Sequence, residues 1–105
     1  MAVLVLPISN DKAHYEFITT LDGVEYVFTF RYNFRSADWY MSIADDTKQP
    51  ILSGIPVRVN RDLLDQYRSY PVPQGLMLCI NNVNPKVEAT RDSFSKDVVI
   101  LYYEV

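Results

Sequence analysis

The chain has 105 residues and a net charge of −3; 49% of its residues are hydrophobic and 22% are charged. This length predicts a single domain over residues 1–105 that buries roughly two-thirds of its unfolded surface, and this charge gives no electrostatic reason to expect nucleic-acid binding. One cysteine, Cys79, excludes an internal disulfide, and the apolar N-terminus is too short for a signal peptide or a membrane span, so we expect a soluble, intracellular protein.

The chain begins with strand-like segments. Residues 2–6 form an apolar run that Pro7 ends, which predicts a short strand that is either buried on both faces or paired at a sheet edge. Residues 14–20 alternate between apolar and polar side chains and predict a second strand. Asp22-Gly23 follows, and this pair favours a two-residue type I′ turn, which needs positive φ at both positions. Such a turn pairs Leu21 with Val24, Phe17 with Phe28 and Tyr15 with Phe30.

Residues 24–34 organise the predicted core, because strict period-two alternation predicts a strand with one buried face. Fully burying each large side chain of that face stabilises the fold by about 1.5–3 kcal/mol. The expected inward residues are Val24, Tyr26, Phe28, Phe30, Tyr32 and Phe34. Trp39, Met41 and Ile43 continue one face of a third strand before Asp45-Asp46, which completes a three-stranded meander over residues 14–44.

The second half is less regular. Residues 50–59 predict one or two short edge strands with a bulge or bend at Gly54. Residues 60–62 open a predicted helix of about two turns, with Leu63, Leu64 and Tyr67 at helical spacing. Two more strands, at 76–80 and 98–103, and one helical turn at 90–94 complete the prediction. The expected fold is all-β with one short helix: a small antiparallel β-barrel or sandwich of six to seven strands.

The sequence shows no enzyme. His14 and Cys79 are the only histidine and thiol, and a core thiol with a strand-end imidazole is a better interpretation than a catalytic dyad. No cysteine–histidine pair has metal-ligand spacing. Asp45 and Asp46 are adjacent in a turn, where aspartate commonly bonds nearby backbone amides. We therefore predict no catalytic, metal-binding or cofactor-binding residue.

One cluster has the composition of a protein interface. Arginine and tyrosine are enriched in interaction hot spots, and five such residues surround the predicted helix: Arg58, Arg61, Tyr67, Arg68 and Tyr70. They are the candidate partner interface. The alternative is that these long side chains cover the domain's own core.

A series of short segments over nearly the whole chain carries a family resemblance. They are residues 6–10 (LPISN), 20–23 (TLDG) with Tyr26, Phe28 and Phe30, Trp39, 50–55 (PILSGI), Leu63-Leu64 with Tyr67-Arg68, 73–75 (PQG), 90–94 (TRDSF) and 98–104. In order and spacing they resemble the baseplate plug proteins of tailed bacteriophages, mainly those with contractile tails. Tyr32 stands where that family has tryptophan, and Lys48 where it has a turn glycine.

The resemblance implies a structural virion protein at the tail tip, which fills or lines the lumen where tail tube, hub and spike meet. Its implied partners are the hub, spike and tube proteins, with several copies in a symmetric baseplate assembled in the host cytoplasm. It implies no catalytic residue and no cofactor.

Two other functions remain open from the residues. A small-ligand or carbohydrate-binding β-barrel would use Trp39 and tyrosines as a stacking platform and would be a monomer with an exposed aromatic cleft. An enzyme built on Cys79 and His14 would lose its turnover in a Cys79→Ser variant. The structural role predicts instead that other chains cover the apolar termini and residues 58–70.

Overall fold

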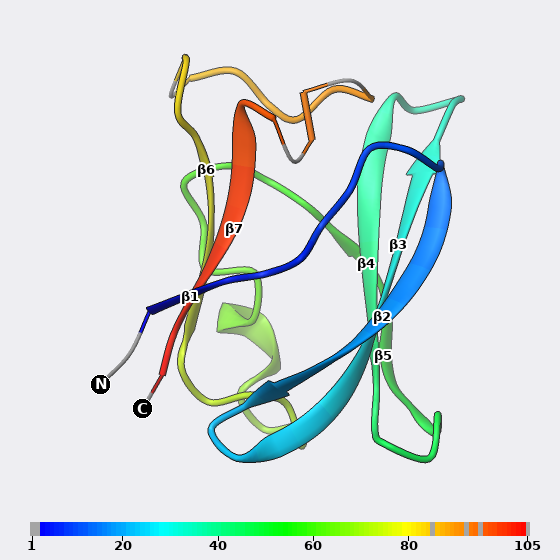
Figure 1. Ribbon diagram of the computed structural model, residues 1–105, viewed down its shortest axis with the longest axis vertical. Helices are drawn as coiled ribbons and strands as arrows, with labels where there is room; N and C mark the ends of the chain where they lie inside the picture. Colours follow the sequence, from blue (N-terminus) through cyan, green and yellow to red (C-terminus); the bar gives the residue numbers. More distant parts are fainter. Residues whose placement is uncertain (1–2, 85, 92, 95, 105) are drawn as a thin grey trace.

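The computed structural model describes residues 3–84, 86–91, 93–94 and 96–104. Within them, seven strands form two antiparallel sheets that face each other as a sandwich (Figure 1). The three-stranded sheet has the order β1-β7-β6, and the four-stranded sheet has the order β2-β3-β4-β5. The strands are β1 (Val3–Val5), β2 (His14–Leu21), β3 (Val24–Asn33), β4 (Asp38–Ala44), β5 (Pro50–Pro56), β6 (Leu76–Asn81) and β7 (Val98–Tyr103). The all-β class is confirmed, and the architecture is the open sandwich and not the closed barrel.

The predicted hairpin is confirmed in its turn and in its register. Asp22 and Gly23 have φ angles of 52° and 78°, the left-handed values that a type I′ turn needs. The register of β2 on β3 pairs Leu21 with Val24, Phe17 with Phe28 and Tyr15 with Phe30. Turn chemistry and hydrophobic pattern therefore specify the same pairing.

Gly23→Val is expected to lower the free energy of unfolding by about 1–2 kcal/mol, because a β-branched residue fits the left-handed region poorly. A Cβ at Gly23 would meet no atom within 4 Å, so the cost is conformational and not steric. Urea unfolding measures it, with Gly23→Asn as the control, since asparagine tolerates positive φ. Equal stability of Gly23→Val and the unchanged protein would place the turn elsewhere.

An aromatic core joins the sheets. Phe28, Phe30 and Met41 are fully buried on the inner face of the four-stranded sheet. Phe94, from the loop before β7, stacks on Trp39 with ring centroids 4.4 Å apart. The loop that follows β6 and precedes β7 therefore closes one end of the core.

The prediction that residues 24–34 have one buried face is wrong at both ends of the segment. Val24 is 51% exposed beside the hairpin turn, and Phe34 is 72% exposed beyond the end of β3. Period-two alternation continues past the part of the strand that the opposite sheet covers. Phe34 instead packs its ring edge-on against Tyr32, 5.0 Å away.

A cross-sheet link ties the hairpin turn to β7. The Tyr102 hydroxyl donates a hydrogen bond to an Asp22 carboxylate oxygen, and it accepts one from the Gly75 N–H at 2.7 Å. The Asp22 N–H in turn donates to Glu104 Oε2 at 3.1 Å. Desolvation by burial, followed by the bond to Asp22, raises the pKa of Tyr102, so the hydroxyl stays protonated as a donor.

Strand β5, at the edge of the four-stranded sheet, has the bend predicted at Gly54. The register of β4 on β5 shifts between Met41 and Ile43, and Gly54 has a φ of 73°. Lys48, in the preceding turn, has a φ of 66°, so the backbone there has the conformation that glycine adopts most easily.

The predicted two-turn helix is wrong. The segment contains only a 3-10 helix, η1 (Asp65–Tyr67). Residues before it run along the edge of β6: the Asn60 N–H donates to the Cys79 carbonyl at 2.7 Å and the Leu63 N–H to the Met77 carbonyl at 2.8 Å. Asp62 also forms an antiparallel bridge with Leu78, and Asn60 has a φ of 61°, so residues 60–63 follow the edge of β6 in a conformation that is not helical.

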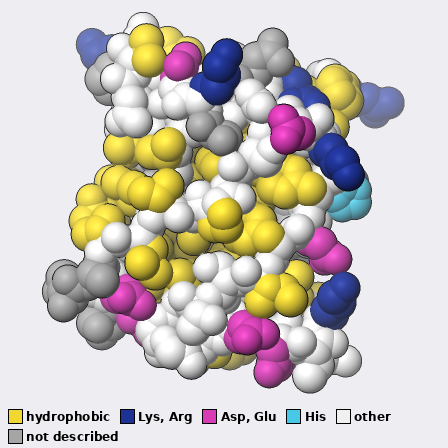
Figure 2. All heavy atoms as spheres, viewed as in Figure 1, with side chains coloured by type: hydrophobic (Ala, Val, Ile, Leu, Met, Phe, Trp, Pro, Cys, Tyr) yellow, Lys and Arg dark blue, Asp and Glu magenta, His cyan; other side chains and the backbone are white. Residues whose placement is uncertain are grey.

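The terminal strand β1 pairs at a sheet edge, one of the two predicted alternatives. Val3 and Val5 are 52% and 63% exposed, and Figure 2 shows apolar side chains gathered on the side of the molecule that β1, β6 and β7 form. Residue 2 of the predicted strand, and residue 92 of the predicted helical turn at 90–94, lie outside the described residues.

Candidate functional site

The residues of the candidate interface lie around one surface pocket of about 420 Å³, between the end of β5 and η1. Three of them line the pocket: Arg58, Arg61 and Tyr67. Arg61 is exposed, and Tyr70, outside the pocket, is 48% exposed. The Tyr67 and Tyr70 rings lie 6.3 Å apart. The segment after β5 therefore brings these cations and rings onto one part of the surface.

Arg68 braces the fold from within this segment. Its guanidinium donates to the Gly75 carbonyl at 2.9 Å and to the Pro73 carbonyl at 3.2 Å, and it pairs with the Asp62 carboxylate. The other Asp62 oxygen accepts hydrogen bonds from the Leu64 and Met77 N–H groups, each at 3.2 Å. Arg68 and Asp62 thus connect η1, the proline-rich loop and β6.

Arg58 is also engaged within the chain. Its guanidinium donates to Asp38 Oδ1 at 2.9 Å, at the start of β4. Of the five predicted interface residues, Arg61 and Tyr70 are the two that are exposed. That the group forms a partner interface stays a prediction.

Arg68→Ala is expected to lower the free energy of unfolding by about 1–3 kcal/mol, because it leaves the half-buried Asp62 carboxylate without its cation and two carbonyls without their donor. Arg61→Ala removes the same charge from an exposed position and is the matched control, with an expected change within about 0.5 kcal/mol. Thermal and urea unfolding measure both. Equal losses in the two variants would contradict the bracing role.

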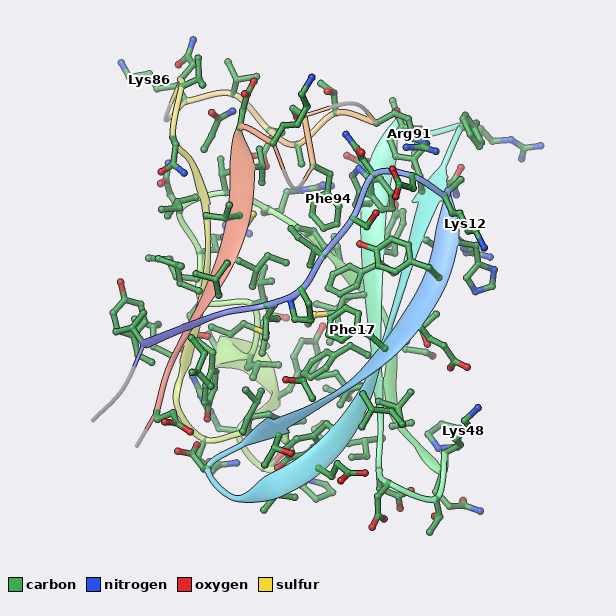
Figure 3. All side chains as sticks on the ribbon, in the orientation of Figure 1. Lys12, Phe17, Lys48, Lys86, Arg91 and Phe94 are labelled. Atoms are coloured by element: carbon green, nitrogen blue, oxygen red, sulfur yellow. The ribbon has the colours of Figure 1, made fainter. Side chains whose placement is uncertain are left out.

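Trp39, the central residue of the carbohydrate-binding alternative, does not lie on an open surface. Trp39 is 1% exposed, and its Nε1–H donates to the Thr90 carbonyl at 2.9 Å. The Arg91 guanidinium lies over the indole, 5.6 Å from the ring centroid, and Phe94, labelled with Arg91 in Figure 3, stacks on the indole. The tryptophan therefore works as a core residue.

The residues of the Cys–His alternative lie apart in the fold. Cys79 is fully buried on the inner face of β6, and desolvation raises its pKa to about 12, so the thiol stays protonated at neutral pH. His14 begins β2 in the other sheet and lines a separate shallow pocket with Tyr15, Glu16 and Thr29. The structure does not bring the two side chains into one site.

Asp45 organises a turn. Its Oδ1 accepts hydrogen bonds from the Thr47 hydroxyl and from the Thr47 and Gln49 N–H groups, and the Thr47 hydroxyl and the Gln49 amide hold the pKa of Asp45 below its usual value. Within the described part of the chain, no three His, Cys, Asp or Glu side chains lie close enough together to hold a metal ion. In the same residues, no helix is long and apolar enough to cross a membrane.

Sequence reasoning missed one surface, the outer face of the three-stranded sheet. The signal was present in two continuous apolar runs, LMLCI at 76–80 and VVILYY at 98–103. A run without alternation is typical of a strand whose two faces are both covered.

Comparison with known proteins places the chain in a family. A family model described as cyanophage baseplate Pam3 plug gp18 matches residues 3–105, which is nearly the whole chain. No curated protein matched the sequence. The family match confirms the resemblance drawn from the ordered segments of the sequence. The chain therefore belongs to the cyanophage baseplate Pam3 plug gp18 family, whose role is structural and whose place is the phage baseplate.

Proposed function

We propose that this protein is a non-enzymatic plug that fills or lines the lumen of the tail tip, where tail tube, hub and spike meet. The observation that carries the proposal is the family match over residues 3–105. The fold is compatible with it: the chain forms a compact body of 31 × 27 × 23 Å with a densely packed aromatic core. Such a body can block a channel through its shape.

The mechanism is shape-complementary binding within a symmetric ring. Several copies, assembled with hub, spike and tube proteins in the host cytoplasm, hold the tail closed until the baseplate rearranges. Surface contacts hold the plug in place, and they break when the neighbouring subunits move apart. No chemical step is needed for release.

Arg61 and Tyr70 are the proposed contact residues of the segment after β5, because both are exposed and both are residue types that dominate binding energy. Arg58 and Arg68 position the segment through Asp38 and Asp62. Substitutions of Arg61 and Tyr70 should therefore weaken binding, whereas substitutions of Arg58 and Arg68 should lower the stability of the fold.

Native mass spectrometry tests the proposal, with the purified protein alone and mixed with hub, spike and tube proteins of the same virion. We expect a defined ring or a stoichiometric complex. The double variant Arg61→Ala/Tyr70→Ala is expected to weaken the complex at least about tenfold with an unchanged melting temperature, whereas Arg35→Ala in the β3–β4 turn leaves it intact. A monomer that binds none of the tail proteins would refute the proposed function.

A further inference from the structure

Three of the four strands at the sheet edges, in the described part of the chain, are protected against pairing with another chain. Residues 60–63 run along the edge of β6, with a bridge from Asp62 to Leu78. Strand β5 begins and ends at a proline and shifts its register on β4, and β1 has only three residues. Prolines, irregular pairing, short length and a covering segment are common ways in which proteins keep an edge strand from pairing.

Strand β2, the fourth edge strand, has none of these protections over its eight residues. The Tyr32 N–H donates to the Ala13 carbonyl at 2.7 Å and so continues the unbroken register of β2 on β3. The odd-numbered residues of β2 therefore direct their main-chain groups toward β3, and the even-numbered residues direct theirs away from the sheet. No hydrogen bond among the described residues uses these outward groups. They belong to His14, Glu16, Ile18 and Thr20.

The side chains of these residues match a second copy of β2 that runs antiparallel to the first. Ile18, which is 59% exposed, lies between two polar residues on the outer face of the sheet. A pairing centred on Ile18 brings the two Ile18 side chains together and sets Glu16 against Thr20 of the second copy. It also sets His14 against Asp22 of the second copy, an imidazole against a carboxylate. No like charges oppose each other, whereas an in-register parallel pairing would set Glu16 beside Glu16 of the second copy.

We propose that two copies of this chain pair antiparallel through β2, about a two-fold axis at Ile18. The pairing joins the two four-stranded sheets into one continuous sheet. Ile18 pairs with Ile18 of the second copy, and Glu16 pairs with Thr20 on either side of the axis. Each of these residue pairs exchanges two main-chain hydrogen bonds. The bonds use the outward main-chain groups of β2, which the single chain leaves to water.

The second copy is chosen over a strand of another protein because the edge is complementary to itself. The second copy supplies an apolar side chain at the centre and polar side chains on both sides of it, at the matching spacing. Two-fold pairing also uses the open edge of both copies, so the assembly stops at two and leaves no edge to pair further. The segment that carries Arg61 and Tyr70 follows β5, at the other edge of the sheet, and stays available to tail proteins. The pairing is therefore separate from the proposed function and compatible with it.

Sedimentation velocity of the purified full chain over a range of concentrations measures the pairing, and we expect a reversible dimer. Ile18→Glu and Ile18→Lys each bring like charges together at the two-fold axis, so each variant alone is expected to dimerise at least about fivefold more weakly. An equal mixture of the two variants brings opposite charges together and is expected to recover the dimer. Val83→Glu and Val83→Lys are the matched controls, since Val83 is 72% exposed in the loop between β6 and β7. Circular dichroism verifies that every variant is folded.

Recovery of the dimer in the mixture supports the inference, because it requires residue 18 of one copy to face residue 18 of the other. An unchanged protein that is monomeric at every concentration would overturn it. So would charged variants that dimerise as the unchanged protein does, or a mixture that stays monomeric. A monomeric chain that binds hub, spike or tube proteins would leave the proposed function standing while this inference fails. A dimer that forms as inferred but binds none of the tail proteins would refute the proposed function and leave the pairing intact.

Discussion

Phe28→Ala is expected to lower the free energy of unfolding by about 3–5 kcal/mol, the range for deleting a buried phenyl ring. Phe28 is fully buried at the centre of β3. Its ring lies 5.8 Å from that of Phe17 and 6.3 Å from that of Tyr26, between centroids. Removing it leaves a cavity among rigid rings, which cannot collapse to fill the space.

Phe34→Ala is the matched control for Phe28→Ala, because it deletes the same side chain one residue beyond β3, where the ring is 72% exposed. Its expected effect is within about 0.5 kcal/mol, as for other surface changes. Urea unfolding of both variants compares them directly. A loss of less than about 1 kcal/mol for Phe28→Ala would reverse the assignment of the inward face of β3.

Gly75→Ala is expected to lower the free energy of unfolding by about 3 kcal/mol, at the upper end of the cost of overpacking. A Cβ at this position would lie 2.1 Å from the Tyr103 carbonyl oxygen and 2.7 Å from the Tyr102 ring. The backbone oxygen cannot move aside without shifting β7. The shift also weakens the bond from the Gly75 N–H to the Tyr102 hydroxyl, and with it the link to Asp22.

Gly54→Ala is the control for Gly75→Ala, since a Cβ at Gly54 would meet no atom within 4 Å. Its positive φ of 73° adds only the conformational cost of about 1 kcal/mol. Thermal unfolding ranks the two variants. If Gly75→Ala melted at the same temperature as Gly54→Ala, the close approach of β7 to Gly75 would be refuted.

The meander was predictable because its determinants are local. Alternation in β2 and β3, together with Asp22-Gly23 between them, specifies one register, and the structure has that register. The alternation does not show where burial ends. Val24 and Phe34 continue the apolar pattern, yet both are exposed, because the opposite sheet does not extend over them.

The sequence predicted which residues make up the candidate site, but not what each of them contacts. Clustered arginine and tyrosine predict a partner interface around the segment after β5; three of the five residues line one surface pocket there, and the interface itself stays a prediction. The sequence could not show that Arg68 reaches Asp62, Pro73 and Gly75, because those contacts depend on how the loop folds back onto β6. Nor could helical spacing of Leu63, Leu64 and Tyr67 reveal that nearby N–H groups pair across the sheet.

The sequence by itself determined the strands, the hairpin turn, the all-β class and the family, since these depend on side-chain alternation, turn chemistry and the order of short segments. Only the tertiary structure decided how strands are shared between the sheets. Val3 pairs with Tyr103 from the opposite end of the chain, and packing of the two sheets against each other buries Val98, Ile100 and Tyr102 of β7. Contacts between distant residues leave no periodic signal in the local sequence, so the sharing of strands between the two sheets became visible only in the folded chain.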